Sequence, residues 1–225
     1  MTAEWVEILY LDDDDLFRVG DSPVIDFPRL EELACGSFPI HDLPGDSDAV
    51  KTPAVCPKLR RWHLKAYPAM LFQGIDGQDV LTTIATIAPS LTHLFFSGLQ
   101  QEGWFPSRLK AALDVIDPRQ SSSFTRNADA PSFNQRTSHL GRFPESIERI
   151  YVKPAAPPAA GGKCGNPYLS YFSLERGLEA VCREDSRIVL LPSYSDHRVR
   201  YMLSEWEERT NGGDGCWSLP NRIAT

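Results

Sequence analysis

The chain has 225 residues, 42% of them hydrophobic, and carries a formal net charge of −7. This length and composition can bury a sizeable core in one large domain or two small ones, which excludes a wholly disordered chain. Residues 1–50 carry 13 acidic and two basic side chains, a balance that argues against a nucleic-acid partner. No apolar run approaches the roughly 18 residues that cross a bilayer, so no membrane partner is expected.

The cysteines indicate a reducing compartment. They are odd in number, widely spaced and without a C-x-x-C pair, at positions Cys35, Cys56, Cys164, Cys182 and Cys216. Small secreted domains are usually built on paired cysteines, and the N-terminus here has no cationic and apolar leader. We therefore expect the protein in the cytoplasm or the nucleus.

A pattern of three apolar residues, spaced apolar-x-x-apolar-x-apolar, recurs along residues 1–153. Its copies are Val6, Leu9 and Leu11; Leu30, Leu33 and Cys35; Leu59, Trp62 and Leu64; Leu91, Leu94 and Phe96; and Ile147, Ile150 and Val152. Successive copies start 24, 29, 32 and 56 residues apart. The last interval spans about two units, so one repeat is missing, degenerate or replaced by an insertion.

One short strand in about every 20–32 residues is typical of a leucine-rich repeat, in which a helix or loop returns the chain to the next strand. A single unit cannot bury its apolar face, so the units must stack. The asparagine that usually follows such a strand is absent from all five copies, which indicates irregular repeats. We predict an α/β fold in which residues 1–153 form an irregular leucine-rich-repeat solenoid of parallel strands.

The segments between the strands differ in character. Residues 78–91 predict a helix with Asp79 as its N-cap and Pro89 closing it; its apolar face comprises Val80, Leu81, Ile84 and Ile87. Residues 105–117 fit a helix through Leu109, Leu113 and Ile116 or a short strand, and the helix is favoured. Residues 119–139 have almost no aliphatic side chains and predict a mobile insertion. Residues 154–167 predict a second flexible link.

Residues 168–225 predict a cap that covers the end of the sheet. Ser173 can begin a helix whose apolar residues are Leu174, Leu178 and Val181. Residues 187–192 read as a short buried strand. Ser195 can begin a second helix, with Val199, Met202, Leu203 and Trp206 on one face and with Asn211 and Gly212 at its end.

Four stretches resemble the repeat region of fungal F-box and leucine-rich-repeat proteins: FPRLEEL, CPKLRRWHL, APSLTHLFFSGL and the ending LSEWEERTNGGDGCW at 203–217. In that family, an N-terminal F-box helix bundle binds a Skp1-type linker of a ubiquitin ligase while the repeats hold a substrate. Residues 1–50 contain no helical F-box pattern, and the chain begins almost directly with the strand WVEILYL. The resemblance implies the substrate-binding repeat region of a ubiquitin ligase adaptor, with a Skp1-type partner only if an F-box precedes this chain.

Motifs that could carry chemistry are better explained as structure. The four adjacent carboxylates at 12–15 cannot converge on one cation and lack a calcium-loop pattern. Ser195, Asp196 and His197 lie side by side, whereas nucleophilic catalysis brings such groups together from separate elements, so a hydrolase that uses residues 193–198 is the least favoured alternative. Residues 159–165 lack the first glycine of a phosphate-binding loop.

The histidines do not point to a metal site. They are His41, His63, His93, His139 and His197, and none has a metal-ligand spacing relative to the cysteines. We therefore expect no metal, no cofactor and no enzymatic activity.

The x positions of the strands point away from the core and together form one open face. Acidic residues lie at one end of this face, and arginine and aromatic residues lie in its middle and at its far end. Arginine, tyrosine and phenylalanine are enriched at binding hot spots, so the face predicts recognition of a protein or peptide. The candidate binding residues are Glu31, Glu32, Arg60, Arg61, His63, His93, Phe95, Arg149 and Tyr151. The alternative is a plainly solvated face in a structural or vestigial repeat fragment without a partner.

Overall fold

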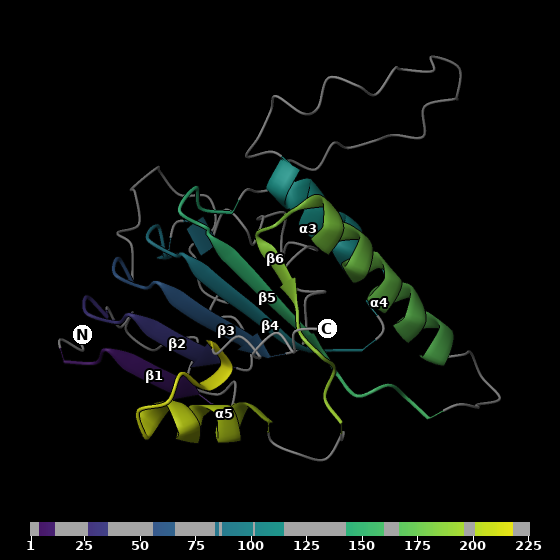
Figure 1. Ribbon diagram of the computed structural model, residues 1–225. Coiled ribbons are helices and arrows are strands. Elements are labelled where there is room, and N and C mark those ends of the chain that lie inside the picture. Colours follow the sequence, from purple (N-terminus) through teal and green to yellow (C-terminus); the bar gives the residue numbers. More distant parts are fainter. Residues whose placement is uncertain are drawn as a thin grey trace, which may run out of the picture.

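The chain folds as an α/β structure around one parallel sheet (Figure 1). The computed structural model describes residues 5–11, 27–35, 56–65, 84–85, 87–100, 102–114, 143–159, 167–195 and 201–217. The strands are β1 (Ile8–Leu11), β2 (Glu32–Cys35), β3 (Arg61–Lys65), β4 (His93–Leu99), β5 (Arg149–Pro154) and β6 (Ile188–Leu190). They pair in chain order, and every pair is parallel.

The predicted register of the apolar pattern is confirmed. Leu33 pairs with Trp62, Trp62 with Leu94, and Leu94 with Ile150, and all four side chains are buried in the main core. The third apolar residues of successive copies also pair with one another and are buried: Leu11, Cys35, Leu64, Phe96 and Val152. Alternate residues of a strand point to opposite faces, so this register determines which side chains lie on the other face of the sheet.

A tight turn leads into most of these strands and explains the proline in the recurring stretches. The amide of the first apolar residue donates to the carbonyl three residues earlier, in the pairs Leu30 to Phe27, Leu59 to Cys56, Leu91 to Ala88 and Ile147 to Pro144. In the first three turns, a proline stands at the second position, where its fixed φ suits the turn.

Neighbouring units are joined by a repeated backbone contact. At the junction of β1 and β2, the amides of Glu31 and Glu32 both donate to the carbonyl of Glu7, at 2.7 and 3.1 Å. The same contact recurs from Arg60 and Arg61 to Glu31, from Thr92 and His93 to Arg60, and from Glu148 and Arg149 to Thr92. The amino ends of β2 to β5 are therefore held in the same way.

Ile84 and Ile87, which are helical, lie in the core, and within the described residues two longer helices cover the same face of the sheet. They are α3 (Phe105–Asp114) and α4 (Pro167–Glu184), which lie beside each other in Figure 1. Phe105, Leu109 and Leu174 lie in the same core cluster as the strand residues. The helices approach closely at Gly177, where an added Cβ would lie 2.8 Å from Cγ of Pro106. No helix within the described ranges combines the length and apolar character needed to cross a bilayer.

The C-terminal segment lies on the opposite face of the sheet. It comprises α5 (Tyr201–Thr210) and the short 3-10 helix η4 (Gly215–Trp217). The predicted end of α5 is confirmed, because the helix stops at Thr210 and Gly212 adopts a positive φ of 90°. Gly215 also has a positive φ, 55°, and an added Cβ there would lie 2.6 Å from the carbonyl oxygen of Glu205. A glycine at 215 therefore allows η4 to fold back onto α5.

Several element predictions are confirmed and others are wrong in detail. The helix in 105–117 and the short strand in 187–192 are present. The helix expected from Ser173 begins instead at Pro167, and the helix expected from Ser195 begins at Tyr201. Residues 154–156 are not a flexible link, because β5 includes Pro154, and Ala155 and Ala156 are buried.

Other predictions fall on residues that the structure does not describe. Of the helix expected in 78–91, Ile84, Ala85 and Ile87 are helical, and the two isoleucines are buried. The remaining segments outside the described ranges include the acidic residues 12–15, the expected insertion 119–139 and residues 160–166 and 196–200.

Candidate functional site

The face opposite the core is covered along the middle of its central strands. Phe95 is 0% exposed and His63 is 2% exposed. Trp217 of η4 packs against Phe95 and Tyr151, with ring centroids 6.0 and 5.9 Å apart. The prediction that Phe95, His63 and Tyr151 form an open binding patch is therefore wrong. The physical reason is that a parallel sheet with aromatic side chains on its second face needs cover on both faces.

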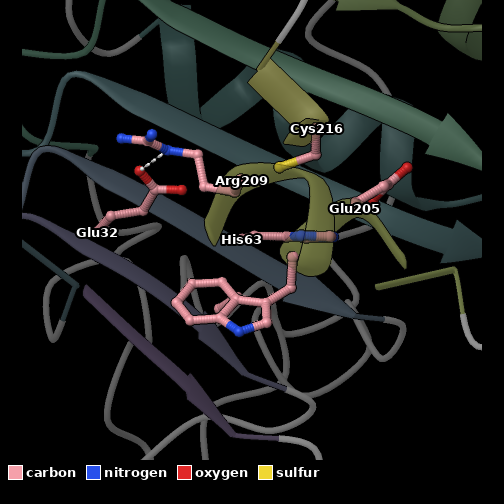
Figure 2. A pocket seen from close by; sticks show the side chains of 7 residues that line it. Glu32, His63, Glu205, Arg209 and Cys216 are labelled. Atoms are coloured by element: carbon pink, nitrogen blue, oxygen red, sulfur yellow. Dashed lines mark hydrogen bonds and ion pairs between the residues drawn. The ribbon is translucent and has the colours of Figure 1, made fainter. Parts of the chain in front are cut away.

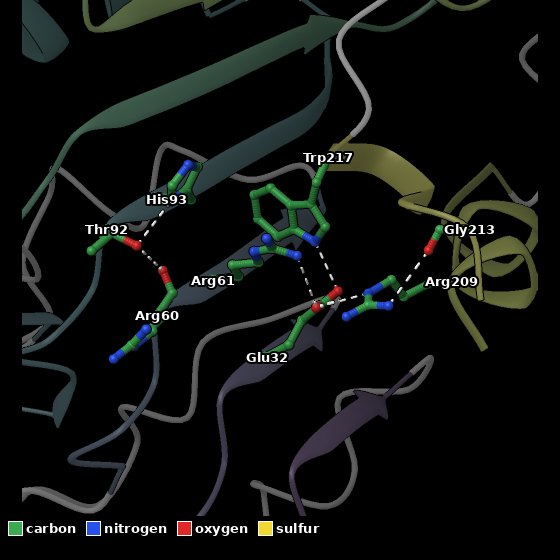
Figure 3. Close-up of polar contacts among 8 residues, drawn as sticks. All are labelled: Glu32, Arg60, Arg61, Thr92, His93, Arg209, Gly213 and Trp217. Atoms are coloured by element: carbon green, nitrogen blue, oxygen red, sulfur yellow. Dashed lines mark hydrogen bonds and ion pairs between the residues drawn. The ribbon is translucent and has the colours of Figure 1, made fainter. Parts of the chain in front are cut away.

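Glu32 on β2 fastens the C-terminal segment to the sheet (Figure 3). One of its carboxylate oxygens accepts a hydrogen bond from Nε1 of Trp217 at 2.7 Å, and the other accepts one from Nε of Arg209 at 3.1 Å. The guanidinium of Arg61 lies 3.8 Å from the same carboxylate and 5.9 Å from the centre of the Trp217 ring. The sequence predicted that Glu32 is an exposed contact for a partner. This prediction is wrong, because Glu32 is buried and anchors the C-terminal segment.

A small polar pocket lies between the sheet and the C-terminal segment (Figure 2). Its lining residues are Glu32, Ala34, His63, Glu205, Trp206, Arg209 and Cys216. The free volume of the pocket is about 10 Å³, roughly the space that one small occupant such as a water molecule needs.

The polar groups around this pocket form one connected network. Nε2 of His63 lies 2.8 Å from Oγ of Ser97, and Nζ of Lys153 donates to Oε1 of Glu205 at 2.7 Å. The hydroxyl of Tyr194 reaches the same carboxylate oxygen at 3.5 Å, and the Lys153 ammonium lies over the Tyr194 ring. A side-chain hydrogen bond between Tyr194 and Ser97 joins the two sets of contacts. The groups come from β3, β4, β5, the segment after β6 and α5, so the network exists only in the folded chain.

Burial governs the electrostatics of this pocket. Desolvation, with help from the charges of Lys153 and Lys65, lowers the pKa of His63 to about 3. Burial, followed by the charges of Glu205 and Glu32, raises the pKa of the Cys216 thiol well above its ordinary value. His63 and Cys216 are therefore both neutral at pH 7 in the protein without a bound cation.

The exposed part of this face lies where the strands begin. We call the following residues the amino-end row: Glu7, Ile8, Glu31, Arg60, Arg61, Thr92, His93, Glu148 and Arg149. Each is exposed or half-buried. The row is acidic at β1 and β2 and basic at β3, and it carries one acidic and one basic residue at β5. Burial, and then the charge of Arg61, lowers the pKa of His93, which favours its neutral form.

The structure divides the predicted binding residues into two groups. Glu31, Arg60, Arg61, His93 and Arg149 belong to the amino-end row. The remaining candidates are buried beneath the C-terminal segment: Glu32, His63, Phe95 and Tyr151. The strand β3 contributes to both groups, because Arg61 at its start is half-buried whereas His63 lies beneath the C-terminal segment.

Sequence reasoning missed the residues that the C-terminal segment contributes. Glu205 and Arg209 are polar, so they did not enter the apolar face assigned to the helix. A signal was nevertheless present for Arg209, because it lies about one helical turn from Trp206, and both residues line the pocket. Cys216 gave no signal, since its pocket neighbours on the sheet, Glu32, Ala34 and His63, are distant in sequence.

Comparison with protein-family models, with curated proteins and with solved structures finds no significant match.

Proposed function

We propose that this chain is a protein-recognition module, built from irregular leucine-rich repeats, that binds a protein or peptide partner along the amino-end row. The observation that carries the proposal is the recurrence of one backbone contact at each junction from β1 to β5. That contact spaces the starts of neighbouring strands at roughly 4.8 Å, so their exposed side chains form a continuous line. A regular line of exposed side chains on a buried scaffold suits the recognition of an extended segment.

The charge of the row supports selectivity. Glu31 and Arg60 are exposed neighbours, and their signs are opposite. A partner segment that lies along the row would present a basic side chain near Glu31 and a carboxylate or phosphate near Arg60. Phe95 is buried, so it offers no apolar anchor. The exposed apolar side chains at the acidic end, Trp5 and Ile8, are better placed for that role.

The experiment compares capture of partners from cell extract by variants of the row. Arg60→Glu reverses an exposed charge and Glu31→Lys reverses its neighbour; neither disturbs the buried Glu32 anchor. Arg176→Glu on α4 is the matched control, because it is the same charge reversal at an exposed site away from the row. We expect specific partners to be lost with Arg60→Glu and kept with Arg176→Glu. The same partner list for all three variants and the unaltered chain would favour a structural fragment without a partner.

The narrower proposal is the substrate-binding region of an F-box-type ubiquitin ligase adaptor that acts in the cytoplasm or nucleus. It rests on the resemblance of the repeat units and of the ending at 203–217. A binding assay with a purified Skp1-type linker distinguishes a ubiquitin ligase adaptor from a recognition module without a ligase role. Recognition of a partner without binding of the linker would leave a recognition module with no ligase role in this chain.

A further inference from the structure

Three side chains with metal-binding atoms meet beneath the C-terminal segment. His63 on β3, Glu205 on α5 and Cys216 on η4 each place one ligand atom within 4.8 Å of the other two (Figure 2). No other group of three such residues occurs within the described ranges. His63 lies far in sequence from Glu205 and Cys216, and only the packing of α5 and η4 on the sheet brings the three together.

Each of the three side chains can offer an atom to a cation. Oε1 of Glu205 accepts a hydrogen bond from Lys153, whereas Oε2 is buried and has no hydrogen-bond partner among the described residues. Cys216 is not in a disulfide. His63 uses one ring nitrogen for Ser97, and a hydrogen bond on one nitrogen is the usual companion of metal ligation by the other. A buried carboxylate oxygen without a partner is costly, and a bound cation would satisfy it.

We propose that His63, Glu205 and Cys216 bind a divalent transition-metal ion, and that Zn²⁺ is the ion this site takes. Nitrogen, carboxylate oxygen and sulfur together form a ligand set that Zn²⁺ accepts, whereas Mg²⁺ and Ca²⁺ prefer oxygen ligands alone. This inference is independent of the proposed recognition of a partner.

The geometry needs only a small adjustment. Zinc bonds of about 2.0–2.3 Å in a tetrahedral site place ligand atoms roughly 3.3–3.8 Å apart. Side-chain shifts of about 1 Å would therefore bring the three ligand atoms to these separations. The pocket between the side chains has room for a small occupant. When zinc binds, the Cys216 sulfur loses its proton to the buffer and bonds to the metal as a thiolate. The fourth position is left for a water molecule.

The bound ion would fasten the C-terminal segment to the sheet at a second point. Glu32 already holds Trp217 and Arg209. A metal site would link β3 directly to both α5 and η4. Because these ligands come together only in the folded chain, the ion would favour that state.

The test begins with the tag-free full chain after treatment with a chelator. Addition of Zn²⁺ at about 100 times its dissociation constant should raise Tm by about 5–10 °C, with one ion bound per chain. Co²⁺ added in place of Zn²⁺ should give a thiolate-to-cobalt charge-transfer band in the near ultraviolet, together with the visible bands of a four-coordinate site.

Two cysteine variants assign the site. Cys216→Ser should lose the charge-transfer band and most of the zinc-dependent rise in Tm. Cys182→Ser is the matched control, because Cys182 is a half-buried cysteine on α4 outside the cluster, and it should keep both signals. Circular dichroism of each variant in chelator verifies that it folds. Should Cys216→Ser not fold, Glu205→Gln takes its place; it should keep the thiolate band but weaken zinc binding at least tenfold.

The proposal is overturned if the unaltered chain shows no thiolate-to-cobalt band or no rise in Tm with Zn²⁺. It is equally overturned if Cys216→Ser folds and keeps the full band, because the metal would then be held by other cysteines.

Discussion

The face of the sheet that packs against α3 and α4 is apolar along every strand. The face beneath α5 and η4 buries the carboxylate of Glu32 and the imidazole of His63 beside aromatic rings. The first face is held by the burial of side chains that recur in each unit. The second is held by a few directed contacts between residues far apart in the chain, such as Glu32 with Trp217. One sheet can therefore combine a cover specified by repetition with a cover specified by individual polar contacts.

The two covers should fail in different ways. Apolar burial in the first face is shared among many side chains, so its loss should weaken the whole fold. The polar anchors of the second face act at single points, so their loss should release the C-terminal segment while the sheet stays intact.

The largest effect is expected on the core face. Leu94→Ala removes a side chain that is 0% exposed from the centre of the sheet, and it should lower the free energy of unfolding by about 2–5 kcal/mol. Leu169→Ala is the matched control, because Leu169 on α4 is 65% exposed, and it should cost less than about 0.5 kcal/mol. Denaturant titration measures both variants. Equal losses would contradict the assignment of Leu94 to the core face.

A smaller and more local effect is expected at the anchor of the second face. Glu32→Gln removes the charge that holds Arg209 and should cost about 1–3 kcal/mol. Glu31→Gln changes the exposed neighbour in the same way and should be nearly neutral. In hydrogen exchange, amides in 201–217 should lose protection in the Glu32 variant while those of β3 keep it. Equal loss of protection in 201–217 and in β3 would contradict this prediction, because it would mean that the C-terminal segment unfolds only together with the sheet.

The smallest of the three effects concerns pH. The pKa of His63 is lowered to about 3 in the folded chain and returns to about 6.5 on unfolding, so the unfolded state binds the extra proton first. The neutral imidazole therefore contributes stability above pH 6.5, and this contribution is lost progressively as the pH falls toward 3. Between pH 7.5 and 5.5, this one group should lower the free energy of unfolding by about 1.4 kcal/mol.

The measurement compares the unaltered chain with His63→Gln in the presence of a chelator. The charged and titratable groups around His63 are common to both proteins: Lys153, Lys65, Glu32, Glu205, Arg209 and Cys216. The difference in pH dependence between the two therefore isolates the imidazole. Parallel stability curves from pH 7.5 to 5.5 would mean that His63 is not buried as a neutral group.

The recurring spacing of the sequence was enough to predict the register of the sheet. Leu59 closes a turn, and Trp62 and Leu64 alternate within the strand that follows, so their inward direction follows from local geometry. The start of α4 was less well predicted. Ser173 is a good N-cap in isolation, but Tyr171 is buried on the same side as Leu174, and this packing favours a helix that begins earlier, at Pro167.

Sequence alone predicted the parallel strands, because one short unit recurs along the chain, and the side of each strand that faces the core, because side chains alternate within a strand. It also identified Arg60 and Arg149 as outward residues, and these are exposed. Only the tertiary structure decided that Phe95 and His63 are buried beneath α5 and η4. The contacts that bury them join residues more than a hundred positions apart, such as His63 and Cys216. No local periodicity encodes such contacts, because their free energy arises only when the folded chain brings the partners together.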